Sequence, residues 1–208
     1  LWRHDIDVSV HRALALARLE QAAGVRATYF VHLHSVFYNA FEPAIASMFR
    51  AIAALGHEFG VHFDPHALGC RPEDAASMAA PLLLEAAALH TLVGVAPVAV
   101  SLHDPDRHGG TVTDADDIGG LVSTYGRTLR DRFTYRSDSN GRWRERDLAD
   151  DLASGAHPRL QVLTHPEWWV PEAMTPRERI ARAINGRAAA VARGYDTALA
   201  ELGRPNYR

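Results

Sequence analysis

The sequence predicts an α/β fold in which outer helices cover a parallel sheet, either as a (β/α) barrel or as an open sheet. Short runs rich in β-branched and aromatic residues alternate with longer helical stretches along the chain. Acidic residues and histidines follow the ends of those short runs, where the reactive groups of α/β proteins gather. The length of 208 residues suits one domain, which we expect to span 1–208.

The expected elements follow from this alternation. The run Ala27-Thr28-Tyr29-Phe30 is a typical strand, and helical stretches end at Gly24 and Gly56. Pro81 predicts a kink in the third helix. Strands are expected over 1–6, 27–33, 58–63, 97–102, 133–136 and 159–164. Helices are expected over 8–23, 43–55, 72–93, 146–153 and 176–202, with a long loop over 104–120.

The composition narrows the class of partner. The formal charge of −3 gives no electrostatic case for binding nucleic acid or an anionic membrane. The single cysteine, Cys70, excludes an internal disulfide and a cysteine-based zinc site. No run reaches the ~18 consecutive apolar residues of a spanning helix. We therefore expect a small-molecule or glycan substrate and neither a nucleic-acid nor a membrane partner.

The composition also bears on the cellular compartment. The chain is rich in alanine and arginine and contains no lysine, which is typical of a GC-rich bacterial coding sequence. No signal peptide is visible at the beginning of the sequence. We therefore expect a cytoplasmic bacterial protein.

Two clusters of acids and histidines carry the chemistry. Asp5 and Asp7 are two residues apart on the first strand, so both carboxylates point the same way. His62 and His66 are four apart, so a helical turn or tight loop would aim both imidazoles at one point. A carboxylate with two imidazoles can hold a divalent metal, and a second carboxylate is a ready general base. This pattern predicts a metal-dependent hydrolase.

Further reactive residues follow other strands. His103, Asp138 and His165 all lie at or just after expected strand ends. In a barrel these ends form one rim, so we expect the groups to converge. Plainer interpretations remain open: Asp7 as a helix cap, His62 and His66 as a capping and a core histidine, and Asp138 and His165 as turn residues.

In these motifs the chain resembles the polysaccharide deacetylases (the NodB-homology group, carbohydrate esterase family 4), and specifically the branch whose first motif reads His-Asp-hydrophobic-Asp. The resemblance covers nearly the whole chain in order. It is carried by Arg3-His4-Asp5-Ile6-Asp7, Ala27-Thr28-Tyr29-Phe30-Val31, Gly56-His57-Glu58-Phe59-Gly60-Val61-His62 with His66, Ser101-Leu102-His103, Ser137-Asp138 through Trp143, and Leu163-Thr164-His165-Pro166.

The resemblance implies a distorted (β/α) barrel of about seven parallel strands and removal of an N-acetyl group, usually from an amino sugar. It implies a divalent metal, zinc first, with cobalt, nickel, manganese or iron as alternatives. Mapped by motif order, Asp7, His62 and His66 are the metal ligands, Asp5 is the base and His165 is the acid. Two other hydrolytic or binding roles stay open: cleavage of a non-sugar amide, and an inactive carbohydrate-binding relative.

The chain departs from the family pattern in two motifs. Ile6 separates the two aspartates that are adjacent in the family, so the roles of Asp5 and Asp7 could be exchanged. His103-Asp104-Pro105 replaces the third motif, whose arginine contacts the base. Candidates for that arginine are Arg3, Arg107 and Arg136.

The remaining site residues are assigned by chemistry and position. We expect Asp138 to hydrogen-bond His165 and to raise the pKa of that imidazole, because a nearby carboxylate favours imidazolium. Trp168 would stack on a sugar ring, or else anchor its loop in a hydrophobic cluster. The residues expected to line the substrate site are His103, Arg136, Trp143 and Trp168.

Overall fold

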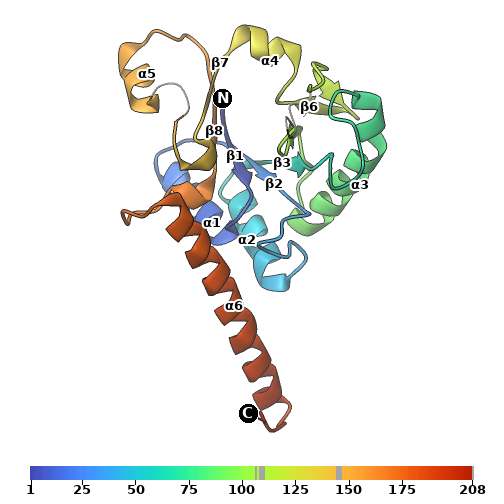
Figure 1. Ribbon diagram of the computed structural model, residues 1–208, viewed down its shortest axis with the longest axis vertical. Coiled ribbons are helices and arrows are strands. Elements are labelled where there is room, and N and C mark those ends of the chain that lie inside the picture. The colour runs from blue at the N-terminus through green and yellow to red at the C-terminus, as the bar shows by residue number, and fades with distance from the viewer. Residues whose placement is uncertain (106, 108–110, 144–146, 208) are drawn as a thin grey trace.

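The computed structural model describes residues 1–105, 107, 111–143 and 147–207, and it shows an eight-stranded sheet curled into a half-barrel with helices around it (Figure 1). The strand order is β5-β6-β4-β3-β2-β1-β8-β7. Neighbouring strands pair in parallel except β5 and β6, which are antiparallel. The predicted α/β class and distorted barrel are confirmed.

The strands agree with the sequence-based expectations except in one region. The loop expected over 104–120 runs into a short antiparallel pair, β5 and β6, which the sequence did not reveal. The strands are β1 (Trp2–Ile6), β2 (Thr28–Val31), β3 (Glu58–Phe63), β4 (Ala99–Leu102), β5 (Asp117–Ile118), β6 (Leu121–Ser123), β7 (Thr134–Ser137) and β8 (Leu160–Thr164).

Five of the helices lie where they were expected, whereas the short helix α4 was not expected, and the first residue of the predicted 146–153 helix is outside the described residues. Local caps set several of their ends: the Ser9 hydroxyl caps α1, and Thr175 forms a capping box with Glu178 in α6. The helices are α1 (Val10–Ala22), α2 (Pro43–Ala54), α3 (Ala75–Val93), α4 (Arg127–Arg132), α5 (Leu148–Ser154) and α6 (Pro176–Glu201), with 3-10 turns η2 (Ser139–Gly141) and η3 (Pro166–Trp168).

Helix α3 continues through Pro81, which cannot donate a backbone hydrogen bond to Ser77 one turn earlier. The Ser77 carbonyl instead accepts a hydrogen bond from the Cys70 thiol at 3.6 Å. By length and hydropathy α3 resembles a membrane span, but it packs one face, including Leu82 and Leu89, into the hydrophobic core.

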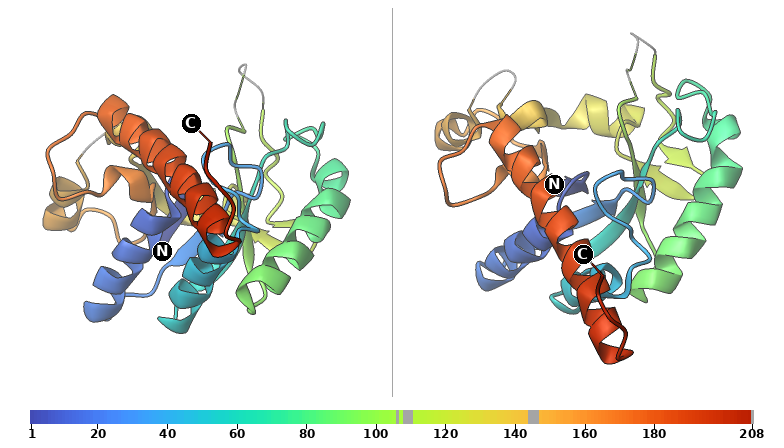
Figure 2. Two further views of the ribbon diagram at one scale, coloured as in Figure 1. Left: turned by 90° about the horizontal axis from the view of Figure 1, so that it is seen from below. Right: turned by 60° about the horizontal axis from the view of Figure 1, so that its bottom comes forward.

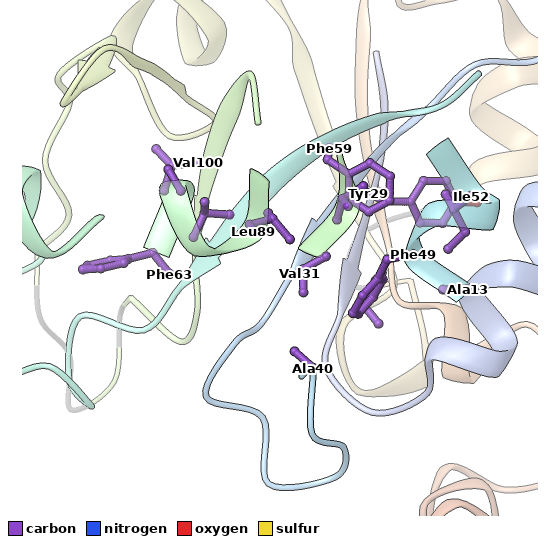
Figure 3. Packing of buried hydrophobic residues seen from close by; sticks show 14 of the residues in the cluster. Ala13, Tyr29, Val31, Ala40, Phe49, Ile52, Phe59, Phe63, Leu89 and Val100 are labelled. Carbon is purple, nitrogen blue, oxygen red and sulfur yellow. The ribbon is translucent and has the colours of Figure 1, made fainter. Parts of the chain in front are cut away.

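The hydrophobic core lies between the convex face of the sheet and helices α1, α2 and α3 (Figure 3). Phe49 of α2 packs edge-on against Phe59 of β3, with ring centroids 6.3 Å apart. Burial of such side chains contributes about 1.5–3 kcal/mol each, which fixes these helices to the sheet. Gly60 lies on the opposite face of β3, where there is no room for a side chain. A Cβ there would lie 2.3 Å from the Phe30 ring and 2.8 Å from the Ala99 carbonyl oxygen.

Successive side chains of β1 point to opposite faces of the sheet, and each face carries a separate group of polar residues. Arg3 and Asp5 point into the concave interior, where Arg3 donates hydrogen bonds to the hydroxyls of Ser101 and Thr124. His4 points the other way and lies 2.6 Å from Glu20 of α1. The concave interior of the half-barrel is therefore polar, and its open end receives the residues that follow the strands.

Helix α6 crosses the end of the half-barrel near α1 and η3 and then runs out past the body (Figures 1 and 2). The structure describes every residue of α6, and none of them is buried. Its first half covers the start of α1 and α2, whereas its second half is exposed on nearly every side.

Candidate functional site

A cavity of about 410 Å³ opens at the carboxyl ends of the strands, and five of the predicted site residues line it: Asp5, Asp7, His62, His103 and His165. This volume is in the usual range for a small-molecule site. Tyr125 and Tyr135 also line this cavity.

Asp7, His62 and His103 converge on one point. The distances are 3.0 Å between Asp7 Oδ1 and His62 Nε2, 3.1 Å between the His62 Nε2 and His103 Nδ1 atoms, and 3.5 Å between His103 Nδ1 and Asp7 Oδ1. Ligands held tetrahedrally at ~2.1 Å from a cation are separated by about 3.4 Å, so this group has the dimensions of a metal site.

The chemistry of the three donors also fits a divalent cation. The His62 Nδ1 donates to the Ser101 carbonyl at 3.1 Å, so Nε2 is the ring atom left to bind a cation, and it faces Asp7. Asp7 Oδ1 is buried and, among the described residues, accepts no hydrogen bond. Burial alone would raise the pKa of Asp7, but His62 and His103 outweigh it and hold that pKa well below the usual value.

His66, the third ligand expected from the sequence, is not among the three residues whose ligand atoms lie within 4.8 Å of one another, although its Nε2 is buried and has no hydrogen-bond partner among the described residues. After β3 the Asp64 carboxylate accepts hydrogen bonds from the backbone N–H groups of His66 and Ala67, at 3.0 Å each. The chain therefore makes a turn after β3. It does not form the helical turn that would align His62 with His66. His103, expected to line the substrate site, takes the third position.

A second group, His32, Asp64 and His103, has ligand atoms within 4.8 Å of one another but is a poorer site. The His32 and His103 rings stack at 4.4 Å with only 24° between their planes, so their in-plane lone pairs do not meet. The His62 and His103 rings are perpendicular, at 89°, which lets both lone pairs reach one cation.

Asp5 lies deeper than Asp7 and outside the ligand group. Its Oδ2 accepts a hydrogen bond from the Ser101 hydroxyl at 2.8 Å, and Arg3 lies 3.9 Å from its Oδ1. Of the three candidate arginines, Arg3 is therefore the one beside Asp5. Its pKa is raised, because the charge of Asp5 outweighs the effect of burial on the guanidinium.

His165 faces the ligand group from the end of β8. Its Nδ1 lies 2.7 Å from Asp138 Oδ1, and its Nε2 lies 3.7 Å from Asp7 Oδ2. Burial lowers the pKa of His165, but the Asp138 hydrogen bond and the charge of Asp7 outweigh it and raise the pKa to about 9. The ring is protonated at neutral pH, with one N–H directed at the cavity.

Three predicted substrate contacts do not line the cavity. Arg136 forms an ion pair with Asp151 on the outer side of β7, because strand alternation turns Tyr135 inward instead. Trp143 and Trp168 are likewise absent from the lining, and the Trp168 ring lies against Gly141. The inward aromatic residues are Tyr125 and Tyr135, which the sequence analysis did not select.

Glu167 is a further buried acid that the sequence analysis missed. It is 4 % exposed and follows His165 by two residues. Burial and the charge of Asp7 raise its pKa to about 8. Its position directly after the His-Pro pair was the only sequence signal that pointed to it.

No family model matches the sequence, and no curated protein matches it. Among solved structures, a mutant CE4 family pseudoenzyme with restored enzymatic activity is similar with a TM-score of 0.54 and 12% identity, over 91% of this chain and 62% of that one. A family 4 carbohydrate esterase from Streptomyces lividans in complex with acetate is similar with a TM-score of 0.50 and 16% identity, over 93% and 88% of the two chains.

These similarities define the class of fold: the chain has the architecture of the CE4 polysaccharide deacetylases, as its motifs predicted. It spans less than two thirds of the first of these structures.

Proposed function

We propose that the protein is a metal-dependent hydrolase that removes the N-acetyl group from an acetamido sugar or glycoconjugate. One observation carries the proposal: the Asp7, His62 and His103 group lies between a buried carboxylate, Asp5, and a protonated imidazole, His165. The similarity to CE4 structures, including one in complex with acetate, supports the same class of reaction.

Asp7, His62 and His103 are the residues that would hold the cation, and their oxygen and nitrogen donors suit zinc. When bound, a divalent cation supplies Lewis acidity, which acidifies water and polarises the amide carbonyl. The ligand set replaces the predicted His66 with His103 and keeps Asp7 and His62.

Asp5 is placed to take the proton of the attacking water. Its Oδ1 is buried and accepts no hydrogen bond from the residues that the structure describes, while Ser101 and Arg3 fix the carboxylate in place. Asp7, not Asp5, belongs to the ligand group, which supports the assignment of Asp5 as base and Asp7 as ligand.

His165 is placed to give a proton to the departing nitrogen. An amide nitrogen is a poor leaving group until it is protonated, and the N–H on Nε2 of His165 faces the cavity. Asp138 holds the ring by its Nδ1 and stabilises the imidazolium, so it is a positioning residue. Tyr125 and Tyr135 offer aromatic surface to a sugar ring.

The test is acetate release from a panel of acetamido sugars and linear amides. We expect no release after metal removal with EDTA, recovery on addition of zinc or cobalt, and faster release from the sugars. Metal binding without acetate release from any sugar would contradict the proposal and indicate an inactive relative. Faster release from linear amides would assign the reaction to a non-sugar substrate.

A further inference from the structure

A second cavity, of about 400 Å³, lies between α6 and the first turns of α1 and α2. Two of its lining residues lie close in sequence to residues that line the catalytic cavity, Val8 directly after Asp7 and Glu167 two residues after His165, although the two cavities share no lining residue. The two cavities are of nearly equal volume and share the same rim of the half-barrel.

Helix α6 provides one wall of this cavity. The wall residues recur every three or four positions, which places them on a single helical face. They are Arg179, Arg182, Ala183, Gly186, Arg187, Ala190 and Arg193. A face that joins arginines to small residues contributes little to a hydrophobic core, and it leaves space between the guanidinium groups. A Cβ added at Gly186 would meet no atom within 4 Å.

Much of the lining is apolar, with Phe37, Ile45 and Met48 among its residues, but its charged groups are mostly cationic although the chain as a whole carries a formal charge of −3. Five guanidinium groups and only two carboxyl groups line the cavity. Arg187 pairs with Glu42 at 2.5 Å, and Arg182 pairs with Glu172 at 3.1 Å. The guanidinium groups of Arg12, Arg179 and Arg193 have no hydrogen bond or ion pair within the described part of the chain, although the charge of Arg12 also acts on Glu172, the partner of Arg182.

A buried guanidinium atom and a helix end add to this excess of positive charge. Arg179 Nε is inaccessible to solvent and lacks a hydrogen-bond partner among the described residues, as does Glu167 Oε2, an acidic oxygen that opposes an anion when it is ionised. Such groups are costly to bury unless a ligand or water completes them. The start of α1 also lines the cavity with Ser9 and Val10, and its first turn contains no acidic residue. The positive end of this helix therefore adds to the attraction for an anion.

We propose that this cavity binds a diphosphate group, and that the substrate is an acetamido sugar linked to that diphosphate. Guanidinium groups match phosphate oxygens in paired hydrogen bonds, and three unpaired arginines balance the charge of one diphosphate. Because Val8 directly follows Asp7 and Glu167 lies two residues after His165, we expect the two ends of such a substrate to occupy the two cavities. The second part of this inference rests on the proposed function, whereas the anion site does not.

The anion site is tested by calorimetric titration of the full chain with inorganic pyrophosphate. Equal affinity is expected for zinc-loaded and EDTA-treated protein, because no member of the cation group lines this cavity. Binding only to the zinc-loaded form would overturn the proposal. The variant Arg12→Gln with Arg179→Gln should bind pyrophosphate at least about tenfold more weakly. Arg18→Gln with Arg177→Gln removes two charges from the same helices outside the cavity and should leave the affinity unchanged.

A steric pair of variants separates the cavity from general charge. Gly186→Phe fills the cavity and keeps every arginine, and we expect it to abolish pyrophosphate binding. Gly194→Phe makes the same change on α6 outside the lining, where an added Cβ also meets nothing within 4 Å. Equal affinity in both variants, or equal loss in both arginine pairs, would overturn the site.

The link to the substrate is tested by comparing acetate release from a nucleoside-diphosphate acetamido sugar and from the same sugar without phosphate. In the Arg12→Gln, Arg179→Gln variant the preference for the diphosphate substrate, as a ratio of kcat/KM values, should fall about tenfold or more through KM. An unchanged preference beside weakened pyrophosphate binding would refute the substrate assignment. Pyrophosphate binding without acetate release from either sugar would refute the proposed function and leave the anion site standing.

Discussion

His165 Nδ1 lies 2.7 Å from Asp138 Oδ1, and the other oxygen of the same carboxylate accepts a hydrogen bond from the Trp169 indole at 2.9 Å. The backbone N–H of His165 donates to Asp138 as well, at 3.0 Å. The carboxylate is thus fixed from three directions, and the imidazole that it holds is oriented toward Asp7. This arrangement determines both the protonation of the ring and its direction.

Asp138→Asn should move the alkaline limit of activity to lower pH. In the proposed mechanism His165 acts in its protonated form, so activity is lost as the pH rises through its pKa, which burial lowers but the Asp138 hydrogen bond raises. Removal of the carboxylate charge lowers this pKa, by about one unit or more. A pH–rate profile measures the shift, and Trp169→Phe, which keeps the carboxylate, is the control. The same alkaline limit in Asp138→Asn would exclude His165 as the acid.

Asp5→Asn should retain the metal and lose turnover. The amide cannot accept the proton of water, and a positioned base contributes roughly 10²–10⁴ in rate. Acetate release and zinc content are measured on the same preparation. Near-normal turnover would remove Asp5 as the base, whereas loss of zinc would indicate that Asp5 and Asp7 exchange roles.

His103→Ala and His66→Ala should differ in metal affinity. His103 Nδ1 lies within 3.5 Å of both other ligand atoms, whereas His66 is outside the group. Loss of a ligand should weaken zinc binding by more than the 10–100-fold typical of an outer-shell partner. Competition with a chromogenic chelator measures both affinities. Weaker binding in His66→Ala than in His103→Ala would restore the ligand set expected from the sequence.

Gly60→Ala should destabilise the fold by roughly 1–3 kcal/mol, because the new Cβ would collide with the Phe30 ring and the Ala99 carbonyl. Gly194→Ala, in a helix with nothing within 4 Å, should stabilise it by up to about 1 kcal/mol. Urea denaturation gives both free energies of unfolding. If Gly60→Ala had the same free energy of unfolding as the unsubstituted protein, the interior would accommodate a side chain at position 60.

The sequence predicted the parts of the site that follow from strand direction. Asp7, His62 and His165 follow parallel strands or lie at their ends, and parallel strands present those ends at one rim. The pairing of Asp138 with His165 could be predicted for the same reason, because β7 and β8 are neighbours.

The placements that differ from the expectations depend on local geometry. The spacing of His62 and His66 fits a helical turn, but the Asp64 side chain builds a different turn that the spacing does not reveal. Strand parity at β7 was also unknown, so Arg136 was selected although Tyr135 faces the cavity. The cavity between α6 and the first turns of α1 and α2 could not be predicted from the sequence. Its arginines come from helices far apart in the chain, Arg12 on α1 and the others on α6.

Anomalous diffraction at the zinc edge, from crystals grown with one equivalent of zinc, tests the central claim most directly. We expect one strong peak about 2.1 Å from Asp7 Oδ1, His62 Nε2 and His103 Nδ1. A peak bonded to His66 in place of His103, or no peak within reach of Asp7 and His62, would contradict it.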